Sequence, residues 1–77
     1  MWFTYILLCE DGSYYTGSTN NIEKRLKDHT NGKGARYTKS HKPVKIVYKE
    51  RFATKSKALK REAEIKSWTR KKKKNLI

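Results

Sequence analysis

Cysteine, proline and acidic residues are scarce in this chain of 77 residues, and each scarcity narrows what the protein can be. The single Cys9 excludes an intrachain disulfide and a cysteine-based zinc site, which fits a reducing compartment. No apolar run approaches the roughly 18 residues of a membrane span, and residues 1–3 begin a strand pattern rather than a signal peptide. We therefore expect one small domain over residues 1–77, cytoplasmic and without a membrane partner.

Acidic residues are far fewer than basic residues. Seven acidic residues stand against twenty Lys and Arg, which gives a net charge of +13. Such a charge density attracts phosphate polyanions, because bound cations release the counterions that surround a nucleic acid. A ribosomal protein or a nucleic-acid chaperone would show the same excess. The charge therefore indicates nucleic acid as the partner and leaves the chemistry open.

Local patterns predict a small α+β domain. Strands are expected at residues 2–9, 13–17 and 44–48, because these runs are apolar, aromatic or β-branched and are bounded by turn residues. Helices are expected at 22–30 and from a cap at Thr54 or Ser56 to about residue 68, with a short helix or ordered loop around 35–37. The expected fold is a three-stranded antiparallel sheet flanked by helices in the order β-β-α-α-β-α, with a core of residues 1–70 and a basic tail at 71–77.

The turn at residues 10–12 decides whether Tyr5 and Tyr15 can act together. A two-residue loop at Asp11 and Gly12 would send the two rings to opposite faces of the sheet. A three-residue loop that includes Glu10, with Gly12 in the left-handed conformation, would place Tyr5 opposite Gly17 and on the same face as Tyr15. We predict the three-residue loop. Tyrosines are also common in strands, so the pair can simply rim the core.

Several short motifs follow one another along nearly the whole chain in the order typical of one family. The GIY-YIG nuclease superfamily, in particular its small stand-alone bacterial branch, is what they resemble, and the excision-repair and homing endonucleases have related catalytic domains. The motifs are Phe3-Thr4-Tyr5, Tyr15-Thr16-Gly17, Arg25 with His29, Lys33 to Thr38, Pro43 to Tyr48, and Ala58-Leu59 with Glu62. The chain departs from the pattern at Phe3-Thr4, at Thr16 and at Ser18, where excision-repair relatives carry a lysine, and we expect no flanking recognition domain.

The helix at 22–30 carries two polar candidates beside its apolar stripe. Arg25 and His29 are four positions apart and so lie on one flank of the stripe formed by Ile22 and Leu26. Arg25 can present its planar guanidinium group to a phosphate, or it can belong to a solvated charged face. His29 can be a base, a phosphate contact or a structural histidine.

Glu62 is singled out by its place on the last helix. Ala58, Leu59 and Ile65 lie four before, three before and three after it, so Glu62 falls within the expected apolar stripe, while Glu64 points away. A carboxylate in such a place needs a cation. A Lys or Arg partner would serve, and so would one Mg²⁺ or Mn²⁺ ion, because hydrated magnesium needs only one or two carboxylates. The resemblance makes Glu62 the metal ligand.

The resemblance implies an endonuclease that hydrolyses phosphodiester bonds in DNA, or alternatively RNA. Its catalytic residues would be Tyr5, Tyr15, Arg25, His29 and Glu62. Arg25 would stabilise charge on the phosphate, and Tyr5 or Tyr15 would position or deprotonate the water, with His29 as the alternative base. Nucleic-acid contacts are expected from Lys24, Lys33, Arg36, Tyr37 and Lys39. With no sequence-reading element visible, we expect selection of a structure such as a branch, flap or nick.

Two other functions remain compatible with the sequence. One is a nucleic-acid-binding module on the same scaffold with little or no catalysis, which the degenerate triplets and the missing partner domain favour. The other is a small basic interaction protein, for example of the ribosome, whose resemblance is accidental. A nuclease requires Tyr5, Tyr15, Arg25 and Glu62 to meet on one surface, and the other two functions do not.

Overall fold

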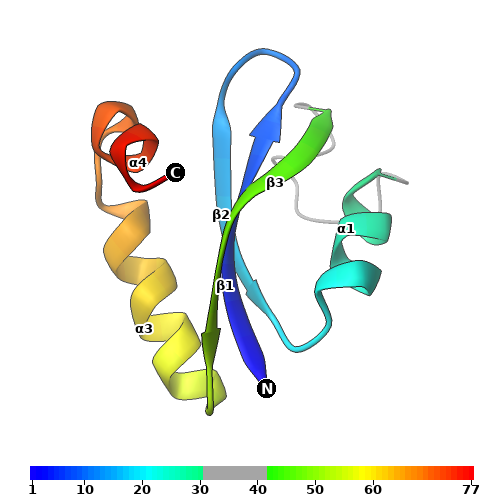
Figure 1. Cartoon of the computed structure of the whole chain (residues 1–77), viewed down its shortest axis with the longest axis vertical. Helices are drawn as coiled ribbons and strands as arrows, with labels where there is room; N and C mark the ends of the chain where they lie inside the picture. The colour runs from blue at the N-terminus through cyan, green and yellow to red at the C-terminus, as the bar shows by residue number, and fades with distance from the viewer. Residues whose placement is uncertain (31–41) are drawn as a thin grey trace.

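A small sheet lies between helices in the computed structural model of the protein, which describes residues 1–30 and 42–77 (Figure 1). The described elements follow the order β-β-α-β-α-α. The α+β class and the three-stranded antiparallel sheet are confirmed, whereas the predicted order is wrong. The short helix or loop expected around residues 35–37 lies outside the described residues. A helix that was not expected follows at the other end, at residues 70–76.

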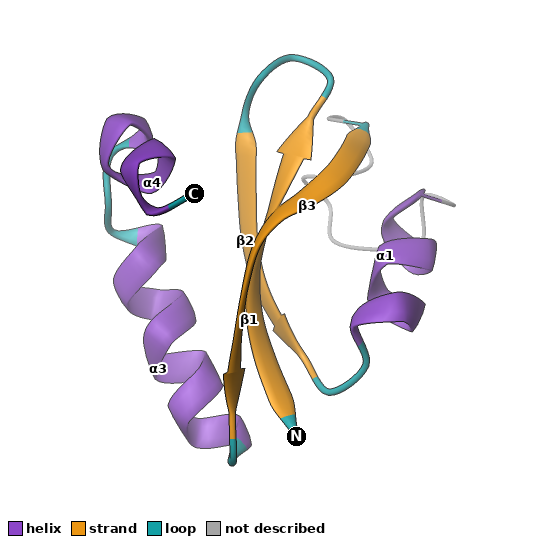
Figure 2. Cartoon of the chain, viewed as in Figure 1, coloured by secondary structure: helices purple, strands orange, loops and turns teal. Residues whose placement is uncertain are grey.

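Strand β1 (Trp2–Cys9) is the centre of the sheet, between β2 (Tyr14–Thr19) and β3 (Pro43–Phe52) (Figure 2). Both neighbours run antiparallel to it. The unbroken apolar pattern of β1 suits a strand that is covered on both faces, and residues 4–7 are all buried. Strand β3 is longer than the predicted 44–48, and its pairing with β1 shifts register twice.

The turn between β1 and β2 is the predicted three-residue loop. The Cys9 N–H donates to the Ser13 carbonyl at 2.9 Å, and the Gly12 N–H donates to the Cys9 carbonyl at 2.9 Å. Gly12 has a φ of 83°, a conformation that a side chain would strain. The Asp11 carboxylate accepts from the Ser13 N–H at 3.0 Å and from its hydroxyl at 2.6 Å. This bulged turn fixes the register of the hairpin.

Helix α1 (Ile22–Thr30) lies on one side of the sheet and helix α3 (Lys55–Lys66) on the other (Figure 1). The bounds of α1 are those predicted. Asn21 and Thr54 cap the two helices, each accepting on its side-chain oxygen the N–H three positions on, at 3.1 and 3.3 Å. The hairpin therefore sits between two helices that approach it from opposite faces.

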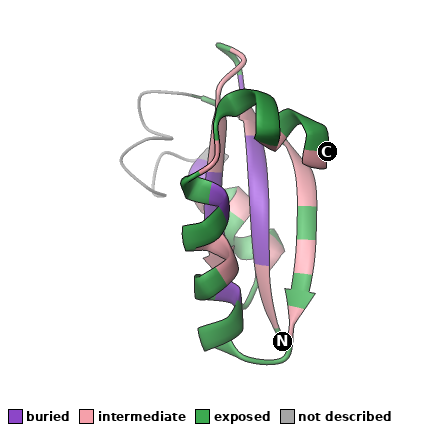
Figure 3. Ribbon diagram, turned by 90° about the vertical axis from the view of Figure 1, so that its left-hand side faces the viewer, coloured by how far each residue is buried: buried purple, intermediate pink, exposed green. Residues whose placement is uncertain are grey.

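Helix α3 packs on the sheet through small and polar contacts. The Thr4 hydroxyl donates to the Ala58 carbonyl at 2.7 Å, and the Ser18 hydroxyl donates to the same oxygen at 3.2 Å. Ala58 and Ile65 are completely buried (Figure 3). Leu59 is 44% exposed, so the apolar stripe expected to include it is narrower than predicted. The reason is geometric, since the turn of the helix carries Leu59 about 100° away from Ala58 and off the contact line.

Helix α4 (Arg70–Leu76) replaces the predicted basic tail. The Thr69 side chain caps it by accepting the Lys72 N–H at 3.2 Å, and a run of lysines has good helix propensity. The helix is tied back to the hairpin, because Arg70 Nη2 donates to the Gly12 carbonyl at 2.6 Å. The Lys72 ammonium lies 4.7 Å from the ring centroid of Trp68. These tertiary contacts hold a helix that is too short to be stable alone.

The described core is thin and contains polar groups. Its buried apolar members are Tyr5, Ile6, Leu7, Cys9, Ala58 and Ile65. Thr16 is buried on the α3 side of β2, opposite Ile6, and among the described residues its hydroxyl oxygen has no hydrogen-bond partner. Within residues 1–30 and 42–77, no helix has both the length and the apolar character needed to cross a membrane.

Candidate active site

The hairpin brings Tyr5 and Tyr15 to the same face. Tyr5 pairs with Gly17 and Leu7 pairs with Tyr15, as the three-residue turn predicts. The ring centroids of the two tyrosines are 6.4 Å apart, with an angle of 47° between the planes. The prediction that the two rings share a face is confirmed, and the register of one short turn decides it.

Gly17 forms the floor beneath both rings. A Cβ atom built on Gly17 would lie 2.6 Å from the Tyr5 Oη, 2.8 Å from its Cζ and 3.1 Å from the Tyr15 Cε2. Real Cβ atoms essentially never have contacts shorter than 3.0 Å, so a side chain here would require the Tyr5 ring to move. The Tyr5 ring lies across Gly17, which carries its hydroxyl to the outer strand of the hairpin. The sequence prediction did not include Gly17 among the site residues, although the second triplet contains it.

Helix α1 supplies His29, which packs against both tyrosine rings. Its Nε2 and the Tyr5 hydroxyl are 3.0 Å apart and share a hydrogen bond. The imidazole ring is 5.2 Å from the Tyr15 ring centroid and 6.1 Å from that of Tyr5, with near edge-to-face geometry in both cases. His29 is 1% exposed, and burial followed by the charge of Arg25 lowers its pKa below the ordinary value. The neutral imidazole is therefore the dominant form at pH 7.

Arg25 lies one helical turn before His29 and remains exposed to solvent. It is close enough to the Tyr5 hydroxyl to lower the pKa of that group. A guanidinium group has five N–H donors, which suit it to binding a phosphate. Arg25 thus borders the buried cluster while it faces solvent.

The Tyr5 hydroxyl is a weak acid in this environment. Burial raises its pKa to about 12, and the hydrogen bond from Arg25 opposes that rise. Tyr15 and the carboxylate of Glu62 raise the pKa further, while the Arg25 charge lowers it. The phenol is therefore protonated at neutral pH. Arg25 and Glu62 thus both influence the pKa of one hydroxyl group.

Glu62 reaches the cluster from helix α3, on the other side of the sheet. Its side chain is 18% exposed, against 53% for Glu64 two positions on, so Glu62 faces inward as predicted. Lys66 is the cation beside it, with its Nζ 2.8 Å from the Glu62 Oε2. The same ammonium lies 5.9 Å from the Tyr15 ring centroid. Lys66 was not predicted, although its spacing of four positions from Glu62 is the signal that identifies such pairs.

The predicted nucleic-acid contacts fall into two groups. Lys24 is exposed on α1, one position before Arg25. The other four residues lie outside the described residues, and these are Lys33, Arg36, Tyr37 and Lys39. Their part in binding remains a prediction, and the structure neither adds to it nor removes from it.

Known proteins are similar to this chain over nearly its whole length. A UPF0213 protein of Staphylococcus saprophyticus is 57% identical over 75 residues, which cover 97% of this chain and 92% of that protein. A UPF0213 protein of Staphylococcus epidermidis is 53% identical over the same share of each chain. These are family names that assign no activity.

Two solved structures have the same fold. The solution NMR structure of a UPF0213 protein from Bacillus halodurans matches with a TM-score of 0.61 and 43% identity, and the match covers 99% of this chain and 82% of that one. A solution NMR structure of a protein from E. faecalis matches with a TM-score of 0.64 and 43% identity, over 96% of this chain and 79% of that one. The model of the GIY-YIG catalytic domain matches residues 1–75. The chain therefore belongs to the GIY-YIG catalytic domain family.

Proposed function

We propose that this protein is a metal-dependent endonuclease that hydrolyses phosphodiester bonds in DNA and selects a structure rather than a sequence. The observation that carries the proposal is the surroundings of the Tyr5 hydroxyl. His29 Nε2 is 3.0 Å from it, Tyr15 lies beside it, and the charges of Arg25 and Glu62 both act on it. A purely structural tyrosine does not need three titratable neighbours and a bare glycine beneath its ring.

The residues present fit one divalent ion, Mg²⁺ or Mn²⁺. Over the described ranges, no group of three or more His, Cys, Asp or Glu side chains could enclose a metal. Magnesium does not require one, because it keeps several waters and binds through one or two carboxylates together with substrate oxygens. Glu62 meets that need, since it is the carboxylate beside the cluster and remains 18% exposed. An ion bound there would neutralise charge on the scissile phosphate and on the leaving 3′ oxygen.

Tyr5 and His29 form a path for the proton of the attacking water. With a pKa of about 12, Tyr5 has almost no phenolate to act as a direct base at pH 7. Its oxygen can accept a proton from water while its own proton passes to the neutral Nε2 of His29, 3.0 Å away. The lowered pKa of His29 favours a neutral imidazole, which can take up a proton. Tyr5 thus positions the water, and His29 receives the proton.

Arg25 holds the phosphate. Its exposed guanidinium group can bind two non-bridging oxygens while it stays in contact with Tyr5. As negative charge builds on those oxygens during attack, the fixed positive group stabilises the transition state more than the bound substrate. The net charge of +13 supports binding along the rest of the strand.

A cleavage panel tests the proposal. Duplex, single-stranded, flap, branched and nicked DNA, with matched RNA, would be incubated with and without Mg²⁺ or Mn²⁺. We expect metal-dependent cleavage of a structured DNA that falls by at least about 100-fold in Glu62→Gln and in Arg25→Ala. Glu64→Gln and Lys27→Ala are matched controls on the same helices and should retain activity. Equal activity of Glu62→Gln and the native protein would overturn the assignment.

The alternative function is a nucleic-acid-binding module that does not cleave. The Glu62–Lys66 ion pair favours it, because a lysine already neutralises the carboxylate that is proposed to bind the metal. The Phe3-Thr4 and Thr16 departures from the family signature point the same way. Binding without cleavage of any substrate in the panel, at either metal, would establish this function in place of the first.

A further inference from the structure

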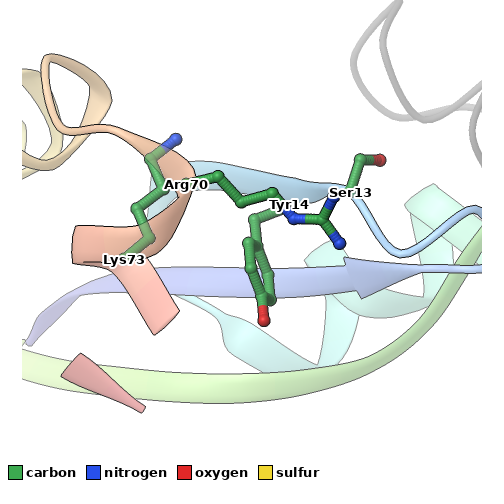
Figure 4. A pocket seen from close by; sticks show the side chains of 4 residues that line it. All are labelled: Ser13, Tyr14, Arg70 and Lys73. Carbon is green, nitrogen blue, oxygen red and sulfur yellow. The ribbon is translucent and has the colours of Figure 1, made fainter. Parts of the chain in front are cut away.

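A hollow lies outside the tyrosine cluster, where helix α4 meets the hairpin. Its lining residues are Ser13, Tyr14, Arg70 and Lys73, and its volume is about 210 Å³ (Figure 4). The lining contains two cations, an aromatic ring and a hydroxyl, with no carboxylate among them. This is the combination that binds a phosphate beside a base.

Arg70 is fixed in place rather than free in solvent. Its Nη2 donates to the Gly12 carbonyl at 2.6 Å, and its Cζ lies 5.9 Å from the Tyr14 ring centroid. Figure 4 shows the side chain extended over the start of β2 toward Ser13. One bond to a carbonyl leaves further N–H donors of the guanidinium group available. An arginine already held in one position loses less conformational entropy when an anion binds.

Lys73 carries its positive charge in an environment that disfavours it. It is half-buried, and within residues 1–30 and 42–77 no carboxylate forms an ion pair with it. Burial, followed by the positive charge of Lys66, lowers the pKa of Lys73. A bound anion would oppose both effects, since it supplies the missing counter-charge. The hollow is therefore electrostatically prepared for a negative ligand.

The hollow is also close to the tyrosine cluster. Tyr14 precedes Tyr15 on β2 and so faces the other side of the sheet, and three residue steps, about 10 Å along the strand, lead from Tyr14 to Gly17. Lys66 connects the two places, because its ammonium pairs with Glu62 while its charge acts on Lys73. A row of cations thus leads from the Glu62 carboxylate to the hairpin turn.

We propose that this hollow binds a phosphodiester group of the strand that is cut, a short distance from the scissile bond, with Tyr14 stacking on the neighbouring base. That the bound strand is also cleaved rests on the proposed nuclease function. The binding itself needs no cleavage. Arg70 and Lys73 neutralise the phosphate, while the Ser13 hydroxyl stays bonded to the Asp11 carboxylate. The site would fix how the strand runs across the domain.

Amide chemical shifts of the native protein test binding directly. A short single-stranded DNA, the matching RNA and inorganic phosphate would each be titrated in EDTA, so that no cleavage occurs. We expect the amides of residues 12–14 and the Arg70 side chain to shift with micromolar to low-millimolar oligonucleotide, and less at equal concentrations of inorganic phosphate. Shifts with inorganic phosphate alone would overturn the strand as ligand, and absence of shifts at residues 12–14 would overturn the site.

Substitution on helix α4 tests the energetic part. Lys71 is the matched control, because it is exposed on the same helix and lies about 160° around it from Lys73. We expect Lys73→Ala to weaken oligonucleotide binding about tenfold and to reduce the salt slope by about 0.7, with a much smaller effect of Lys71→Ala. Lys73→Gln, which keeps the aliphatic stem, should weaken binding in the same way. Equal losses in Lys73→Ala and Lys71→Ala would mean non-specific attraction and would refute a defined site.

The two proposals fail separately. Glu62→Gln should lose cleavage and keep the shifts at residues 12–14. If the native protein cleaves nothing while those shifts persist and depend on Lys73, the nuclease function falls and the phosphate site stands. If cleavage is normal and Lys73→Ala neither weakens binding nor removes the shifts, the phosphate site falls and the nuclease function stands.

Discussion

Buried hydroxyl groups on the two faces of the hairpin have different kinds of hydrogen-bond partner. On the α3 face, the Thr4 hydroxyl donates to the Ala58 carbonyl at 2.7 Å, a bond between neutral groups that do not titrate. On the α1 face, the next residue, Tyr5, has its hydroxyl 3.0 Å from an imidazole nitrogen and within the influence of two charges. Thr4 and Tyr5 are both buried residues, 0% and 1% exposed. Burial of a polar group therefore does not tell a structural role from a catalytic one. The presence of titratable partners does.

The largest expected effect is a loss of cleavage when one of these two hydroxyls is removed and not the other. Tyr5→Phe should reduce cleavage by about 10²–10⁴-fold, because it removes the oxygen that would position water and pass the proton to His29. Thr4→Val, on the opposite face of the same strand, should leave kcat unchanged. Both would be measured as single-turnover cleavage rates at saturating protein. Comparable losses in the two variants would show that the faces do not differ in function.

Gly17→Ala should damage the α1 face through crowding alone. The new methyl group would lie 2.6 Å from the Tyr5 Oη, so the ring must move off the outer strand. We expect a loss of about 1–3 kcal/mol in the free energy of unfolding and about a 100-fold drop in cleavage, since small displacements at a reacting centre are costly. Gly12→Ala strains the turn, whose φ is 83°, and serves as a control for a change in stability of similar kind. Chemical denaturation and cleavage rates would separate the two.

Acidification should destabilise the α1 face through His29. Its pKa is lowered in the folded protein, so the unfolded chain binds the proton more readily, and the contribution of His29 to stability is complete above the unfolded value of about 6.5. That contribution is lost as the pH falls from about 6.5 through the lowered folded pKa. The melting temperature of the native protein should therefore fall more between pH 7.5 and 5.5 than that of His29→Gln. Equal falls would mean that His29 titrates alike in both states.

The smallest expected effects compare two threonines on the α3 face. Thr4→Val should cost about 1–3 kcal/mol of unfolding free energy, because it removes a buried hydroxyl that has a partner. Thr16→Val should stabilise by up to about 1 kcal/mol, because the Thr16 oxygen has no partner among the described residues. The same substitution thus changes sign between neighbouring strands. Urea denaturation at pH 7.5 measures both, and a destabilised Thr16→Val would reveal a partner for that hydroxyl.

Much of the α1 face could be predicted from the sequence, because local chemistry decides it. An Asp-Gly pair after Glu10 defines the turn, the turn sets the register, and the register places Tyr5 beside Tyr15 and over Gly17. The bounds of α1 also follow from its cap and its apolar spacing. The inward direction of Glu62 followed from the positions of Ala58 and Ile65 on the same face of the helix.

The rest depends on tertiary contacts that sequence patterns do not contain. A run of lysines has the propensity for a helix, yet α4 is held by Arg70 on a carbonyl of the distant hairpin, and no local rule predicts that partner. Leu59 was expected in the core because apolar residues usually lie there, and the crossing of α3 over the sheet leaves it outside. Lys66 as the partner of Glu62 was one of several open possibilities that only packing could decide.

The bond from Arg70 to the Gly12 carbonyl joins two residues that are 58 positions apart. During synthesis the hairpin residues leave the ribosome well before Arg70, so the first turn and the face of β2 beside it are without this contact until Arg70 emerges. A phosphate site built across this bond would consequently form only after Arg70 has left the ribosomal tunnel.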